Sequence, residues 1–172
     1  MKNKHFEFTG KEMLIPRGIF LYQIRATKDL PMHNVKKGDV GGWIEKEENL
    51  SGNAWVFKNG RVSGNALASD NVQVSGAAWI TKNARISGNV QASGNSFISG
   101  NVIISDNVKI SDNVWVMEDS TVSGNVKISG DVRIFGNANV SGNLIINENA
   151  RIFGNIKISG DFCITGNSRL YR

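Results

Sequence analysis

The sequence predicts an all-β solenoid, and two observations carry that prediction: an unbroken six-residue repeat and a fixed order of residue types within it. The repeat, typified by ISGNVK, runs from Leu50 to Arg169 in 20 consecutive hexads without an insertion. A short period of this fidelity marks an architecture in which each repeat buries its apolar side by stacking on the next. The chain is therefore expected to build coils over 44–172, preceded by a separate N-terminal segment.

Residues 1–43 lie outside the repeat and are expected to form a small β-rich cap. The stretch IFLYQIRAT predicts a strand, and both histidines of the chain, His5 and His33, fall in this segment. Because the open end of a solenoid exposes strand edges, we expect the cap to cover the first coil. No long apolar run opens the chain, so we expect neither a signal peptide nor a membrane span, and a cytoplasmic location.

Each hexad predicts one short strand followed by one corner. The first position is nearly always Ile, Val or Leu, and the fifth is small or aliphatic in hexads such as those of Ala54, Val72 and Val90. Alternate residues of a strand share a face, so positions five and one point inward and positions six and two point outward. Positions three and four carry Gly in 13 hexads and Asn or Asp in 19, which are the residues suited to a corner.

This phrase resembles that of the hexapeptide-repeat proteins, with their [LIV]-x-x-x-[STAV]-x motif, over Leu50 to Arg169. The resemblance implies a single-stranded left-handed parallel β-helix with three hexads per coil, hence about seven coils. The left-handedness comes from the resemblance alone, because general rules would predict right-handed crossovers between parallel strands. Corner Asn residues then recur every 18 residues and are expected to stack as amide ladders.

The stretch Val35 to Val56 is similar to a group of uncharacterised bacterial and phage hexapeptide-repeat proteins labelled as acetyltransferases, which implies an acyltransferase and a phage-related source. The residues argue against an enzyme. Acyltransferases of that family use a histidine base, yet the hexads contain no histidine and no loop interrupts them. The family's zinc sites need three histidines, and this chain has two. We therefore expect no catalytic residue, no cofactor and no metal site.

The charge pattern and the cysteine content argue against nucleic-acid binding and against a disulfide framework. The net charge is +5, but basic residues are interspersed with acidic ones and no aromatic-rich nucleic-acid motif accompanies them, so nucleic-acid binding is not expected. The single cysteine, Cys163, falls at an outward position and offers no disulfide framework.

One outward face of the predicted prism differs from the two polar ones. Read every 18 residues, its columns gather aromatic side chains, a methionine and arginines, and a stripe this apolar is seldom left in water. The residues of this face, hereafter the aromatic–arginine face, are Trp79, Phe97, Trp115, Met117, Arg133, Phe135, Arg151, Phe153, Arg169 and Tyr171.

Self-association is the expected use of this face, since aromatic residues and arginine carry much of the energy of protein interfaces. We favour an antiparallel homodimer about a twofold axis near Trp115, which sets Arg133 opposite Phe97, and place a homotrimer next. The favoured function is a non-enzymatic binding or scaffold protein that acts on a host protein or holds a small ligand at a subunit junction. The alternatives are a degenerate acyltransferase and a self-assembling structural module.

Overall fold

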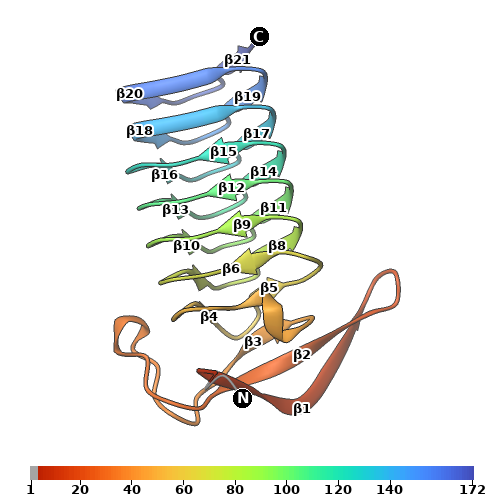
Figure 1. Ribbon diagram of the computed structural model, residues 1–172. Coiled ribbons are helices and arrows are strands. Elements are labelled where there is room, and N and C mark those ends of the chain that lie inside the picture. The colour runs from red at the N-terminus through yellow and green to blue at the C-terminus, as the bar shows by residue number, and fades with distance from the viewer. Residues whose placement is uncertain (1–3) are drawn as a thin grey trace.

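The computed structural model describes residues 4–172, which form an all-β solenoid of stacked coils with a cap at the N-terminal end (Figure 1). Each coil contributes one strand to each of three faces. Strands on one face pair in parallel, and Trp79, Phe97 and Trp115 lie side by side in register. This spacing of 18 residues confirms three hexads per coil. The left hand of the coil rested on the family resemblance alone and stays a prediction.

The first face is a continuous sheet that begins in the cap and ends at the C-terminus. Its strands in the coils are β3 (Val40–Ile44), β5 (Arg61–Val62), β8 (Trp79–Lys82), β11 (Phe97–Gly100), β14 (Trp115–Glu118), β17 (Arg133–Gly136), β19 (Arg151–Gly154) and β21 (Arg169–Tyr171). It carries the aromatic–arginine face.

The other two faces are joined into a second sheet. One face holds β4 (Trp55–Val56), β7 (Gln73–Val74), β10 (Gln91–Ala92), β13 (Lys109–Ile110) and β16 (Lys127–Ile128). The other holds β6 (Leu67–Ala68), β9 (Arg85–Ile86), β12 (Ile103–Ile104) and β15 (Thr121–Val122). Two longer strands, β18 (Asn139–Ile146) and β20 (Lys157–Ile164), run through the corner between these faces and link them.

The corners follow the sequence pattern closely. The third residue of every hexad has a positive φ, whether it is glycine or a side-chain-bearing residue such as Asp106 (φ 69°). The fourth-position amides hydrogen-bond from coil to coil, with Nδ2–Oδ1 distances of 2.7 to 3.4 Å along the column that starts at Asn53 and ends at Asp161. This confirms the predicted amide ladders. Acidic third-position residues add a further tie, since the Asp106 carboxylate accepts a hydrogen bond from the Gly124 N–H at 2.9 Å.

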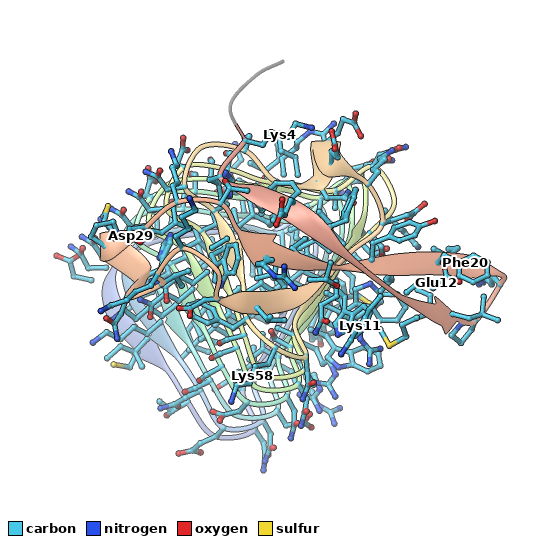
Figure 2. All side chains as sticks on the ribbon, turned by 90° about the horizontal axis from the view of Figure 1, so that it is seen from below. Lys4, Lys11, Glu12, Phe20, Asp29 and Lys58 are labelled. Carbon is cyan, nitrogen blue, oxygen red and sulfur yellow. The ribbon has the colours of Figure 1, made fainter. Side chains whose placement is uncertain are left out.

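The cap consists of β1 (Phe6–Ile15), β2 (Ile19–Ala26), and two short 3₁₀ helices, η1 (Pro31–His33) and η2 (Glu47–Asn49). The β1–β2 hairpin is antiparallel, β2 pairs antiparallel with β3, and β3 pairs in parallel with β5, so the cap extends the first sheet past the first coil. Strand β3 crosses the expected boundary at residue 43, and the division into two segments there stays a prediction. Seen from below, the hairpin crosses the end of the prism and its tip, near Phe20, projects beyond it (Figure 2).

Candidate self-association surfaces

The N-terminal end of the prism is closed by the cap. Phe6, Ile24 and Leu30 of the cap belong to the same buried core as the coils. Trp55, at an outward position of the first hexad, is only 1% exposed, and a Cβ added to Gly41 would lie 2.8 Å from its ring. The glycine pair before Trp43 thus lets the cap approach the first coil closely.

The two histidines attach this cap to the first corner. Nε2 of His5 donates to the carbonyl oxygen of Ala54 at 2.7 Å, and Nε2 of His33 donates to the carbonyl oxygen of Asn53 at 2.7 Å. Burial lowers the pKa of both imidazoles below the ordinary value, and the backbone hydrogen bonds offset part of that shift. Both side chains are therefore engaged in structure. Among the described residues, no group of three or more His, Cys, Asp and Glu side chains is placed to hold a metal ion.

The C-terminal end, in contrast, leaves the core open. Phe162 occupies an inward fifth position, in parallel register with the buried Leu144, yet it is 44% exposed because no coil follows. Ile156 and Leu170 of the same end are half-buried. In Figure 1 strands β20 and β21 form the last layer, so their outer edges are unpaired. Sequence reasoning missed Phe162, although a bulky aromatic at a position that is elsewhere small or aliphatic was a readable signal.

The aromatic–arginine face is assembled as its columns predicted. Trp79, Phe97 and Trp115 form an edge-to-face row with ring centroids 5.6 and 5.7 Å apart. Further along the sheet, Phe153 stacks between Phe135 and Tyr171, with centroids 5.4 and 5.2 Å apart. Because the rings cover one another, most are half-buried; Trp115 is 40% exposed and Tyr171 is 69% exposed.

The arginines of this face bind within their own chain. The Arg133 guanidinium lies 4.5 Å from the ring centroid of Trp115 and pairs with Asp131 at 2.7 Å. Arg151 reaches the other oxygen of Asp131 at 3.1 Å. The hydrogen bond from Arg151, with a smaller contribution from Arg133, lowers the pKa of the Asp131 carboxyl. The expected contacts of Arg133 and Arg151 with a second copy stay predictions, and Arg169 is exposed at the end of the column.

A groove borders this face, which sequence reasoning did not foresee. The tip of the β1–β2 hairpin stands beside β8, β11 and β14 and encloses a cavity of about 650 Å³. Ile15, Pro16 and Ile19 line it on the hairpin side, and Trp79, Phe97 and Met117 line it on the sheet side. Hence the N-terminal half of the face is hollow, whereas the aromatic stack makes its C-terminal half a ridge.

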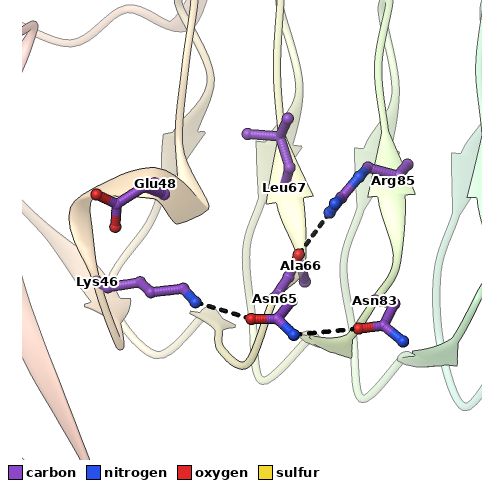
Figure 3. A pocket seen from close by; sticks show the side chains of 7 residues that line it. All are labelled: Lys46, Glu48, Asn65, Ala66, Leu67, Asn83 and Arg85. Carbon is purple, nitrogen blue, oxygen red and sulfur yellow. Dashed lines mark hydrogen bonds between the residues drawn. The ribbon is translucent and has the colours of Figure 1, made fainter.

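A second hollow, of about 430 Å³, lies beside η2 (Figure 3). Lys46 donates to the Asn65 side chain at 2.9 Å, which donates in turn to Asn83 at 3.3 Å, and Arg85 donates to the Asn65 carbonyl. Its polar groups therefore bind one another along an amide ladder. We assign this hollow a structural role.

Among the residues that the structure describes, no helix has the length and apolar character needed to cross a membrane.

Comparison with known proteins points to one family. A family model described as "Bactofilin: Polymer-forming cytoskeletal" matches residues 42–144 and 78–169. Together the two matches cover the coils and leave out β1 and β2. No curated protein matches the chain.

Proposed function

The chain belongs to the bactofilin family of polymer-forming cytoskeletal proteins, and from this premise we propose that it is a scaffold subunit that self-associates by stacking its open C-terminal end on that of a second copy. The family is non-enzymatic, as the residues of the hexads led us to expect. Self-association supports the structural-module alternative better than the host-directed binding protein that we had favoured.

The family match also bears on the resemblance to the hexapeptide-repeat acetyltransferases. A β-helix is confirmed, but membership of the hexapeptide-repeat acetyltransferase group is not shown, and the acyltransferase alternative loses its basis. A phage-related source, action on a host protein and a ligand at a subunit junction receive no support from the match. They form no part of this proposal.

The observation that supports it is the exposure of Phe162. An inward side chain in the last coil stays exposed because no further coil covers it, and the last coil of a second copy would cover it. Burying a fully exposed phenylalanine contributes roughly 1.5 to 3 kcal/mol, and Phe162 is 44% exposed, so a twofold contact gains about half of that value from each copy. The unpaired edges of β20 and β21 would gain partners at the same time, which removes an exposed sheet edge.

The contact is best made between two C-terminal ends. The opposite end presents charged cap residues such as Glu7, Lys11 and Glu12 to solvent, and the core behind them is already covered. The cap also exposes apolar side chains such as Leu14 and Met32, but these lie among charged residues, whereas the C-terminal end exposes an inward position of the coil. A twofold contact of this kind closes on itself and yields a dimer, so a polymer needs a second contact elsewhere on the subunit.

The test is a pair of substitutions at exposed phenylalanines. Phe162→Asp places a charge in the proposed contact, whereas Phe20→Asp changes a ring of the cap that is 43% exposed. We expect the wild-type chain and Phe20→Asp to gain molar mass with concentration in light scattering, and Phe162→Asp to lose the C-terminal contact. Unchanged assembly of a folded Phe162→Asp variant would overturn the proposal.

A further inference from the structure

We propose that the second contact is lateral: the groove beneath the hairpin of one copy receives the aromatic ridge of an antiparallel second copy, and the reverse, about a twofold axis at Met117. This inference rests on the proposed function, because a subunit with only the C-terminal contact stops at a dimer. Two different twofold contacts per subunit instead generate an open chain of copies.

The second positions of the hexads form a column of side chains on the outside of the first sheet. The sizes of these side chains are complementary about the centre of the column. Met117 stands at its centre; the column is small on the N-terminal side, with Ser63, Thr81 and Ser99, and large on the C-terminal side, with Phe135, Phe153 and Tyr171. A twofold axis at Met117 places Phe135 opposite Ser99 and Phe153 opposite Thr81. Thr81 is half-buried, so the ring of Phe153 meets a small side chain directly, whereas Ser99 is only 4% exposed and Phe135 meets the side chains that cover it.

The hairpin gives this small half of the column a wall. Ile15, Pro16 and Ile19 border the cavity of about 650 Å³ above Thr81 and Ser99. A cavity in this range holds a whole small ligand, so it has room for an aromatic side chain. Apolar side chains from both sides make up most of the lining and suit a phenyl ring, while Arg17, Lys82 and Glu118 also border the cavity.

The neighbouring sixth-position column agrees with the same axis. Around Trp115 it sets Arg133 opposite Phe97 and Arg151 opposite Trp79, so guanidinium planes meet rings. Both arginines already share the Asp131 carboxylate, and they enter the contact as paired charges. The contact ends at the outermost coils, because Arg169 would there approach Arg61 of the other copy.

Disulfide trapping at the axis tests the proposal directly. Met117→Cys in a Cys163→Ser background would bring two thiols together only across the proposed twofold. The matched control is Ser111→Cys, a half-buried outward position on a different face of the neighbouring hexad. We expect Met117→Cys to form crosslinked dimers at least about tenfold faster than Ser111→Cys, because a twofold contact raises the effective thiol concentration. Equal rates would overturn the inference.

A second variant separates this contact from the C-terminal one. Phe153→Ser removes the ridge and should leave particles no larger than the C-terminal dimer, whereas Phe162→Asp should leave lateral dimers. Long polymers of a folded Phe153→Ser variant would contradict the lateral contact while leaving the proposed function intact. The apolar dye ANS gives a second readout. If assembled wild-type chains bind ANS as strongly as monomers do, and Thr81→Arg abolishes this binding, the groove is empty in the polymer and the lateral contact is overturned as well.

Discussion

The imidazole of His33 donates through Nε2 to the carbonyl oxygen of Asn53 at 2.7 Å, and so joins the cap to the first corner of the repeat. His5, from the other end of the cap sequence, binds the next carbonyl, that of Ala54. Both rings are buried, and Nδ1 of His33 has no hydrogen-bond partner. A proton added to Nδ1 of His33 would place an unsatisfied charged group inside the protein, and the charge of Lys28 disfavours a proton on His5.

The stability of the cap should therefore fall in mild acid. The folded pKa of each histidine lies below the ordinary value of about 6.5, so the neutral ring is favoured in the folded state. Stability is full above that ordinary value and is lost as the pH falls through it toward the folded pKa, because the unfolded chain binds protons first. Thermal unfolding between pH 8 and pH 5 should show this decline.

The control for this prediction keeps the hydrogen bonds and removes the titration. A chain with His5→Gln and His33→Gln retains an N–H donor at each position but cannot gain a proton in this range. Its unfolding temperature should start lower and vary less with pH. An equal decline in both chains would assign the effect to other groups.

The period of the fold could be predicted from sequence because every coil repeats the same local rule. Positive φ at the third position and the amide ladder at the fourth need only the coil below and the coil above. The aromatic–arginine face followed from the same count of 18 residues. These properties depend only on neighbouring coils, and the same sequence signal for them recurs in every coil.

The groove could not be predicted, because it depends on where a non-repeating segment folds. The hairpin tip around Pro16 lies far in sequence from Trp79 and Met117, and no periodicity links them. The pairing of Arg133 and Arg151 with Asp131 also escaped prediction. Its signal was the exchange of a corner Asn for Asp in one column, two residues before an arginine.

The one hexad with neither Asn nor Asp at its fourth position offers a stabilising substitution. Ala77 interrupts the column between Asn59 and Asn95, whereas further along that column Asn95 donates to Asn113 at 3.1 Å. Ala77→Asn should add a link on each side and stabilise the chain by about 0.5 to 1.5 kcal/mol for each net hydrogen bond formed. Urea denaturation at protein concentrations at which light scattering shows monomers measures this change.

An opposite substitution checks that ladder. Asn89→Ala breaks a column that is continuous, with Asn71 on one side and Asn107 on the other. It should destabilise the chain by a similar amount. If Ala77→Asn has no effect while Asn89→Ala does, the corner at Ala77 holds a geometry that the amide does not fit.

The contact between Arg133 and Trp115 should appear as a coupling free energy. A double-mutant cycle with Arg133→Met and Trp115→Leu is expected to give about 0.5 to 2 kcal/mol, the range for a cation over an indole ring. Unfolding is measured at concentrations at which light scattering shows monomers. The matched cycle of Arg133→Met with Trp79→Leu, three coils away from Arg133, should show no coupling beyond about 0.5 kcal/mol. Equal coupling in the two cycles would argue against a specific contact between Arg133 and Trp115.

Cys163 reports on the proposed C-terminal contact without any substitution. Its thiol is exposed and directly follows Phe162 in the last full coil. Stacking of two C-terminal ends should shield it, so a bulky maleimide should react more slowly as protein concentration rises. In Phe162→Asp the rate should be independent of concentration, since the contact that shields the thiol is gone. A wild-type rate that stays constant while molar mass increases would mean that the chains assemble without their C-terminal ends.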